Sequence, residues 1–263
     1  MVVRSHDAEA GDKARFVRGV EAALMDGEAD LGVHSAKDLP GEQPEGLEIV
    51  GVPVREDPAD AWVGESGSLA DVPEGARVGT ASLRRRAQLA ALRPDLEVVE
   101  VRGNVDTRLR KLEAGECDGL VLALAGLRRL GRADQAAFAF AIEEMTPAAG
   151  HGTLAIQAPS GSPVADRARA ASDRAALVEL AAERAAVGAI GATCDTPVGI
   201  CARLGDELVV HGFAGLPDGS EWVRDRVAGD PDQPAALGEA LADRMLAAGA
   251  RDVLDRATRE VHG

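Results

Sequence analysis

The residues best suited to chemistry lie in an arginine-rich stretch between Gly79 and Lys111. From Arg84 to Lys111 the chain holds eight basic residues, seven of them arginine, against four acidic ones. This segment is therefore strongly positive in a protein whose formal net charge is −15. Arginine stays charged and grips a carboxylate or phosphate with two parallel hydrogen bonds. The cluster indicates either a pocket for a small polyanion or a solvated helix face with i,i+4 ion pairs.

The basic residues of this segment follow the ends of three predicted strands. They are expected over 77–80, 97–101 and 119–124, with helices over 84–92 and 105–114 between them. The arginines that follow the three strand ends are Arg84 and Arg85, Arg102 and Arg108, and Arg128 and Arg129. In open α/β sheets, ligands bind at the carboxyl ends of the strands. Three successive strand ends with arginine favour the polyanion site over a solvated surface.

Two hydroxyl groups stand beside the first of these arginine pairs. Thr80 closes its strand, and Ser82 can cap the helix that follows. The N-terminus of a helix attracts anions because its backbone N–H groups are unpaired and its dipole end is positive. We therefore expect Thr80 and Ser82 to donate hydrogen bonds to the same anionic ligand.

A second group of polar residues follows the apolar run ADLGVHS. This run predicts a buried strand, which places Ser35, Lys37 and Asp38 at its carboxyl end, just before Pro40. In open α/β sheets, ligands bind outside the carboxyl ends of strands, so these polar residues are candidates for chemistry. The alternative is an ordinary turn with an ion pair on the surface.

The remaining candidates are one histidine and three cysteines. His151 lies between two glycines and is either a donor that faces a ligand or an exposed loop histidine. Cys117, Cys194 and Cys201 have no C-x-x-C spacing, which argues against a disulfide framework and a structural zinc. We expect no metal site. A lone cysteine is most often a small buried hydrophobe.

The composition excludes several classes of protein. Aromatic residues make up 2% of the chain and tyrosine is absent, so a nucleic-acid surface built on aromatic stacking is not expected. No run of eighteen apolar residues exists, and the N-terminal stretch lacks an apolar signal core. The sequence therefore predicts a cytoplasmic protein with neither nucleic acid nor membrane as a partner.

Five stretches resemble, in order and spacing, the porphobilinogen deaminase (hydroxymethylbilane synthase) family. They are HSAKDLP at 34–40, GTASLRRRAQL at 79–89, VRGNVDTRLRKLEAGECDGLVLALAGLRRLG at 101–131, PAAGHGTLAIQ at 147–157 and AERAAVGAIGATCDTPVGICA at 182–202. The resemblance covers nearly the whole chain. It implies a transferase of tetrapyrrole biosynthesis that joins four porphobilinogen molecules, releases ammonia at each step and frees hydroxymethylbilane.

The resemblance implies a role for each candidate residue. Each pyrrole carries an acetate and a propionate, so the growing chain accumulates carboxylates. The residues that would bind those of cofactor, substrate and growing chain are Arg84, Arg85, Arg102, Arg108 and Arg129, with hydrogen bonds from Thr80 and Ser82. Asp38 would be the catalytic carboxylate that stabilises the cation left by loss of ammonia, with Lys37 and Ser35 beside it. Arg86 would be a surface residue.

The resemblance also implies a cofactor. Cys194, in GATCDTPVG, aligns with the cysteine that holds a dipyrromethane through a thioether, a bond that a thiolate nucleophile forms readily. Cys117 and Cys201 would be structural. His151 stands where the family usually has glutamine. It would still donate one hydrogen bond to the cofactor site, but its charge would vary with pH.

The implied fold is α/β with three domains. Two lobes like those of periplasmic binding proteins would comprise 1–55 with 152–170, and 58–147, and a smaller α+β domain would comprise 173–263 and present Cys194 to the cleft. The chain would cross between the lobes near 55–58 and return near 147–152. The family expectation is a monomer.

One departure from the family leaves a second function open. The family opens with a strand and helix that carry an Arg-x-Ser segment, and no stretch here matches it. We expect either coding sequence upstream of Met1 or a truncated form. The alternative function is an impaired family member that binds polycarboxylate pyrroles without turnover. An anion-binding protein outside the family would leave Cys194 and Asp38 unexplained.

The patterns predict further elements outside the candidate site. They are a helix from Phe16 to about Gly27, a strand over 47–54, a strand over 153–158, a polar link over 160–169, a helix over 171–187, a hairpin over 208–214 and 221–227, and a final helix over 234–248.

Overall fold

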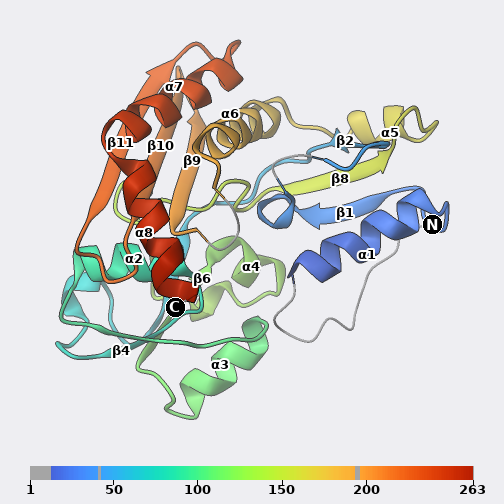
Figure 1. Cartoon of the computed structure of the whole chain (residues 1–263). Coiled ribbons are helices and arrows are strands. Elements are labelled where there is room, and N and C mark those ends of the chain that lie inside the picture. Colours follow the sequence, from blue (N-terminus) through green and yellow to red (C-terminus); the bar gives the residue numbers. More distant parts are fainter. Residues whose placement is uncertain (1–12, 41–42, 193–195, 263) are drawn as a thin grey trace.

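The computed structural model describes residues 13–40, 43–192 and 196–262, which form three β-sheets with helices packed on them (Figure 1). The strand orders are β1-β8-β2, β5-β4-β6-β3-β7 and β11-β10-β9. The fold is thus mixed α/β, as predicted. No helix within these ranges combines the length and apolar character needed to span a bilayer.

The first sheet combines two early strands with one from the middle of the chain. Its elements are α1 (Lys13–Met25), β1 (Gly32–Ser35), η1 (Ala36–Asp38), β2 (Leu47–Gly51), β8 (Leu154–Pro159) and α5 (Ala165–Arg169). β8 pairs antiparallel with both β1 and β2. A Cβ at Gly32 would lie 2.6 Å from Val20 Cγ1. Glycine at this position therefore lets α1 pack closely on β1 and bury Val20 and Leu24.

The central sheet carries the predicted arginine segments. Its elements are β3 (Asp60–Gly64), η2 (Leu69–Asp71), β4 (Arg77–Gly79), α2 (Leu83–Leu92), β5 (Glu97–Val99), α3 (Val105–Glu113), β6 (Gly119–Ala123), α4 (Leu124–Arg129), η3 (Ala133–Gln135) and β7 (Phe138–Ala139). β4 lies between β5 and β6 and runs parallel to both, whereas β3 is antiparallel to β6. The carboxyl ends of β4, β5 and β6 therefore share one edge, as the sequence predicts.

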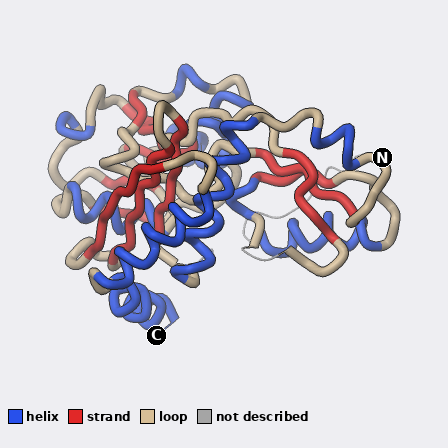
Figure 2. The backbone as a smooth tube through the Cα atoms, turned by 90° about the horizontal axis from the view of Figure 1, so that it is seen from above, coloured by secondary structure: helices blue, strands red, loops and turns tan. Residues whose placement is uncertain are grey.

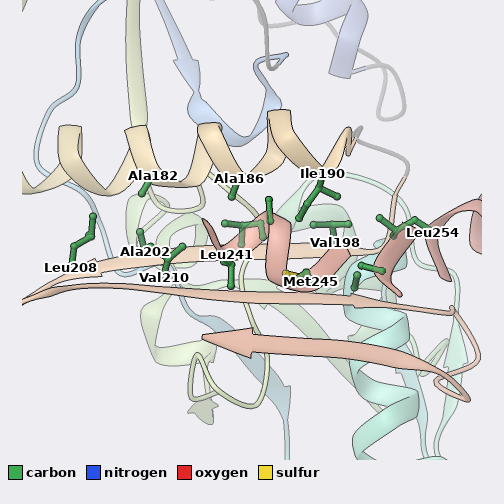
Figure 3. Close-up of a cluster of buried hydrophobic side chains, with 14 residues drawn as sticks. Ala182, Ala186, Ile190, Val198, Ala202, Leu208, Val210, Leu241, Met245 and Leu254 are labelled. Carbon is green, nitrogen blue, oxygen red and sulfur yellow. The ribbon is translucent and has the colours of Figure 1, made fainter. Parts of the chain in front are cut away.

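The third sheet is an antiparallel meander covered by helices on one face. Its elements are α6 (Arg174–Ile190), β9 (Val198–Leu204), β10 (Leu208–Gly215), β11 (Trp222–Gly229), α7 (Pro234–Ala247) and α8 (Ala250–His262). Figure 3 shows side chains of α6, α7 and the strands meeting in one apolar cluster. Gly238 of α7 lies against the backbone of Ala182 in α6, where a Cβ would collide with the Ala182 carbonyl oxygen.

Two crossover segments link the first sheet to the central one. Residues 52–59 lead from β2 to β3, and residues 140–153 lead from β7 back to β8. They lie side by side, because the Glu56 amide donates to the Gly152 carbonyl at 3.1 Å. Figure 2 shows the strands near the N-terminus set apart from the other strands. The crossover segments therefore bridge two separate sheets.

The predicted elements are largely confirmed, including the helix expected over 234–248, which is α7. The prediction that this helix is the final one is wrong, because α8 follows it. Gly249, with a φ of 98°, breaks the two helices apart. α8 is stabilised by burial of Val253 and Ala257 against Leu216, a contact between distant segments that local patterns do not reveal.

Two smaller differences concern strand and link boundaries. The strand expected over 47–54 ends at Gly51, because the next residues leave the sheet and the Val52 amide donates to Ser172 Oγ at 3.0 Å instead. The link over 160–169 contains the short helix α5, whose Ala165 and Ala168 pack beside Val50 of β2. Both differences come from tertiary contacts.

Candidate active site

The predicted catalytic pair lies on a tight turn. Lys37 and Asp38 belong to η1, directly after Ser35 at the end of β1, and all three residues are partly exposed. A Cβ on Gly150 would lie 2.7 Å from Ala36 C and from Lys37 N, and Gly150 has a φ of 71°. Glycine at this position therefore lets the second crossover segment pack directly on the turn that carries Asp38.

The two predicted hydroxyl donors stand at the N-terminus of α2. Ser82 is the N-cap, and its side chain accepts from the Arg85 amide at 3.5 Å. Thr80 Oγ1 accepts from the Ser82 amide at 3.2 Å. The predicted cap is confirmed. Since both hydroxyl oxygens act here as acceptors, each retains a proton for donation to a ligand.

Arg84 and Arg85 are buried around one carboxylate, which sequence reasoning missed. Arg84 Nη1 lies 2.8 Å from Asp60 Oδ2, and Arg85 Nη2 and Nε donate to Asp60 Oδ1 at 2.7 and 3.1 Å. Asp60 is fully buried, which alone would raise the pKa of its carboxyl group. Arg84 and Arg85 outweigh that effect and hold the pKa of Asp60 well below its usual range. The carboxylate is therefore charged.

His151 is buried in the second crossover segment, so the interpretation as an exposed loop histidine is wrong. Its Nδ1 lies 2.6 Å from the Pro58 carbonyl oxygen, which can only accept, so Nδ1 carries the proton. Burial and then the positive charge of Lys37 lower the pKa of His151 well below its ordinary value, despite Asp60. The ring is neutral. Gly150 packs on Lys37, and His151 Nε2 lies 3.8 Å from Asp60 Oδ1, so the turn with Asp38 lies near the buried Arg84–Asp60 cluster.

Among the predicted site residues, Arg108 has the surroundings that most favour the binding of an anion. Its Nε donates to the Gly103 carbonyl at 2.8 Å, and no carboxylate in the described part of the chain pairs with it. Burial, followed by the like charges of Arg85 and Arg102, lowers the pKa of Arg108 to about 10. Arg102 is exposed and pairs with Glu100 at 2.5 Å. Arg108 thus lies near two other arginines, and among the three it alone has no carboxylate partner in the described part of the chain.

The third pair of arginines lies at the end of α4. Arg129 Nη2 donates to the Gly152 carbonyl at 2.7 Å, which ties α4 to the second crossover segment. Arg128 is exposed and pairs with Glu56 at 2.6 Å. Arg129 is therefore placed beside the buried cluster, whereas Arg128 forms a surface ion pair. Arg86 is exposed, as predicted.

A second buried charge cluster, also missed from the sequence, joins the crossover segments to the C-terminal part. Arg55 Nη1 lies 3.0 Å from Glu179 Oε2 and 2.8 Å from Glu183 Oε1, both on α6. Arg55 Nε donates to the His151 carbonyl at 2.9 Å, and Nη1 donates to the Ala202 carbonyl of β9 at 3.2 Å. Arg55 therefore links both crossover segments to the third sheet. The available signal was the spacing of Glu179 and Glu183, which lie four residues apart on the helix predicted over 171–187.

Two of the three cysteines are inert in this structure. Cys117 and Cys201 are buried, and burial raises the pKa of each thiol. A raised pKa reduces the thiolate fraction, which is the nucleophilic form. The structural role predicted for both agrees with this burial. Cys194 lies outside the described residues.

A cavity of about 510 Å³ lies away from all of these residues. It is bounded by the start of β11 and the junction of α7 and α8, and its walls include Trp222, Asp252 and Arg256. None of the predicted site residues lines it. The candidate active site is therefore identified from contacts between side chains and not from this cavity.

Comparison with known proteins gives one consistent family. Residues 3–166 match the family described as "Porphobilinogen deaminase, dipyromethane cofactor binding domain", and residues 177–247 match "Porphobilinogen deaminase, C-terminal domain". A porphobilinogen deaminase from Campylobacter concisus is 42% identical over 95% of this chain and 82% of its own length. One from Thiobacillus denitrificans is 46% identical over 94% and 82%. Among solved structures, a TRAP periplasmic solute binding protein from Desulfovibrio salexigens overlaps 89% of this chain and 65% of its own, at 13% identity and a TM-score of 0.37.

Proposed function

Because this chain belongs to the porphobilinogen deaminase family, we propose which of its residues carry out the family's reaction. The chain is a transferase with hydroxymethylbilane synthase activity, which polymerises porphobilinogen in tetrapyrrole biosynthesis. Both the substrate and every intermediate carry acetate and propionate groups. The site must therefore bind several carboxylates and act on a pyrrole.

The observation that carries this proposal is Arg108, a partly buried arginine that lies near two other arginines and donates to the Gly103 carbonyl. Burial and two neighbouring arginines lower the pKa of its guanidinium to about 10, although no described carboxylate pairs with it. A bound carboxylate would relieve this repulsion and form strong charge-assisted hydrogen bonds. We propose that Arg102, Arg108 and Arg129 bind the acetate and propionate groups, with Thr80 and Ser82 donating from the N-terminus of α2. Arg84 and Arg85 add positive charge to the same site.

Asp38 is proposed to supply the catalytic carboxylate. Loss of ammonia from porphobilinogen leaves a cation, which a nearby carboxylate stabilises while it accepts or returns the pyrrole N–H proton. The close packing of Gly150 on the turn holds Asp38 in place relative to the crossover segment. Lys37 lies near His151 and the buried arginines, where its charge adds to the carboxylate-binding site. Ser35 flanks the pair as a hydrogen-bond donor. His151 is proposed to support the cofactor site indirectly, because its N–H donates to the Pro58 carbonyl of the first crossover segment.

The cofactor of this family fits the donors of the site. Residues 3–166 match a dipyrromethane cofactor binding domain, and the arginines described above suit a group that carries four carboxylates. When bound, the dipyrromethane supplies the pyrrole end to which the substrate units are added. We propose that Cys194 holds it through a thioether. This assignment is supported by the burial and raised thiol pKa of Cys117 and Cys201.

We further propose that each of the three sheets is the centre of a domain. The domains would comprise 1–55 with 152–170, 58–147 and 173–263, and the first two would resemble the lobes of a periplasmic binding protein. A monomer that works in the cytoplasm is proposed. No observation favours the alternative of a binder without turnover.

Intact-mass measurement tests the proposal directly. The purified protein should carry an adduct of two pyrrole units, each with the mass of porphobilinogen less ammonia, and Cys194→Ala should lack it. Cys201→Ala is the matched control and should keep the adduct, because its thiol is buried. An unmodified mass after incubation with porphobilinogen, or an adduct that persists in Cys194→Ala, would contradict the attachment.

A further inference from the structure

Gln157 is a fully buried amide on β8, the middle strand of the first sheet, and takes no part in the proposed chemistry. In the register of the sheet it lies opposite Gly32 of β1. Its side chain contacts three polar side chains from three other segments of the chain: His34 on β1, Glu21 on α1, and Gln43, which lies between η1 and β2. A buried amide is stable when its donors and acceptor are paired in this way. Gln157 therefore joins β8 to three other segments.

The acceptors around Gln157 determine the direction of each hydrogen bond. Its Nε2 donates to Gln43 Oε1 at 2.8 Å and makes a longer contact with Glu21 Oε1 at 3.4 Å, so both amide protons are used. Its Oε1 lies 3.0 Å from His34 Nε2, and an amide oxygen can only accept, so this nitrogen of the histidine carries the proton. Burial lowers the pKa of His34 below its ordinary value, despite the nearby carboxylates of Glu21 and Asp38. The ring is therefore a neutral donor to Gln157.

Two of these contacts lie on opposite sides of the turn that carries Asp38. His34 comes four residues before Asp38, and Gln43 comes five residues after it. Gln43 Nε2 also donates to the carbonyl of Pro40, two residues beyond Asp38, at 3.4 Å. Gln157 therefore connects the segment that enters the turn to the segment that leaves it.

We propose that Gln157 is a positioning residue that closes the base of this turn and so determines where Asp38 lies. It acts through His34 on one side and through Gln43 on the other, and it contacts neither substrate nor cofactor. This inference rests on the proposed function of Asp38 as the catalytic carboxylate. The alternative is a polar network that stabilises the first sheet and has no effect on the reaction.

Steady-state kinetics of the holoenzyme with porphobilinogen, at a temperature where the protein stays folded, test the proposal on Gln157→Met. Methionine keeps the length of the side chain but forms none of the three contacts. The kcat should fall about tenfold to hundredfold, because a displacement of a catalytic group by about 1 Å has an effect of this size. KM should stay near the native value, because the arginines proposed to bind carboxylates follow strands of the central sheet.

A matched variant separates a positioning role from a structural one. Ser172→Ala removes a hydrogen bond beside the same sheet, from the Val52 amide at 3.0 Å, but leaves both sides of the turn untouched. It should lower the melting temperature and leave kcat at the native value. If Gln157→Met does the same, with a lower melting temperature and a native kcat, the proposal is overturned.

Gln43→Met tests one side of the turn alone. It changes a partly exposed side chain and should lower kcat less than Gln157→Met does, because the bond to His34 remains. The two changes together should lower kcat no further than Gln157→Met alone, since Gln43 acts through Gln157. Additive losses would contradict this coupling. If Gln157→Met does not fold, a native kcat in Gln43→Met overturns the proposal.

Failure of the proposed function gives a different pattern. Asp38→Asn would then keep kcat near the native value, which would overturn the catalytic role of Asp38 and this inference with it. A large loss of kcat in Asp38→Asn, together with native kcat in Gln157→Met and Gln43→Met, would overturn the positioning role alone.

Discussion

Replacement of Arg55 by methionine should be among the most destabilising single changes in this protein. The methionine side chain fills similar space but removes the cation that lies 2.8 Å from Glu183 and 3.0 Å from Glu179. Glu183 is then buried without a cation, and Glu179 keeps only the exposed Arg203 at 3.4 Å. It also removes the donors to the carbonyls of His151 and Ala202. Breaking a buried ion pair by removal of one partner costs about 3–5 kcal/mol. The free energy of unfolding of an ordinary domain is about 5–15 kcal/mol, so this change removes a large part of that free energy.

The loss of stability in Arg55→Met should increase as pH rises. Burial raises the pKa of Glu183 above its ordinary value of 4.5, and Arg55 opposes that rise. Without Arg55 the pKa rises further, so the folded variant binds a proton at a pH where the unfolded chain has released it. Stability of the variant therefore falls as pH rises through that window. The difference from the wild type should be smallest near pH 5 and larger near pH 8 (about three pH units apart).

Urea unfolding followed by the fluorescence of buried Trp62 would measure this difference at both pH values. Arg128→Met is the matched control, because it removes an exposed ion pair with Glu56 of similar length, 2.6 Å. Exposed pairs contribute about 0–1 kcal/mol, so the control should unfold almost like the wild type. A loss below about 1 kcal/mol for Arg55→Met, or one that shrinks as pH rises, would refute the reasoning.

Three further predictions concern the proposed site and its support. Asp38→Asn should lower kcat by about 10²–10⁴-fold with a near-native melting temperature, because it removes an acid–base group from a partly exposed turn and keeps the size of the side chain. Arg108→Gln should raise KM for porphobilinogen about tenfold, the worth of one charge-assisted hydrogen bond, whereas Arg86→Gln on the exposed face of α2 should not. Gly150→Ala should reduce the free energy of unfolding by about 1–3 kcal/mol, since its φ is 71° and the new Cβ would press on Ala36; a native urea midpoint would contradict this.

The sequence predicts the part of the site that depends on local pattern. Alternating strands and helices place Arg102 and Arg129 after neighbouring strand ends, and the parallel pairing of β4 with β5 and β6 confirms that these ends share an edge. The cap at Ser82 is equally local, since the residue type and the start of the helix suffice to predict it. Family resemblance adds the chemistry, and the matched families confirm the activity.

The sequence does not predict which arginines are buried. Arg84, Arg85 and Arg86 are consecutive, yet the first two pair with Asp60 and the third is exposed. Asp60 lies in a segment that looks like an ordinary polar crossover, and only the packing of β3 beside β6 brings it beneath α2. Helical spacing gives the direction of each side chain but not the identity of its partner across the sheet.

Three consecutive residues of the second crossover segment contact three separate parts of the proposed site. Gly150 packs on the turn that carries Asp38, His151 donates to Pro58 beside Asp60, and the Gly152 carbonyl accepts from Arg129. Arg55 in turn holds the His151 carbonyl and so connects this segment to α6. A shift of the segment would therefore move Asp38 and Arg129 together. Such a shared support would hold the proposed catalytic carboxylate at a fixed distance from a proposed substrate-binding arginine, and fixed geometry between reacting groups is what efficient catalysis requires.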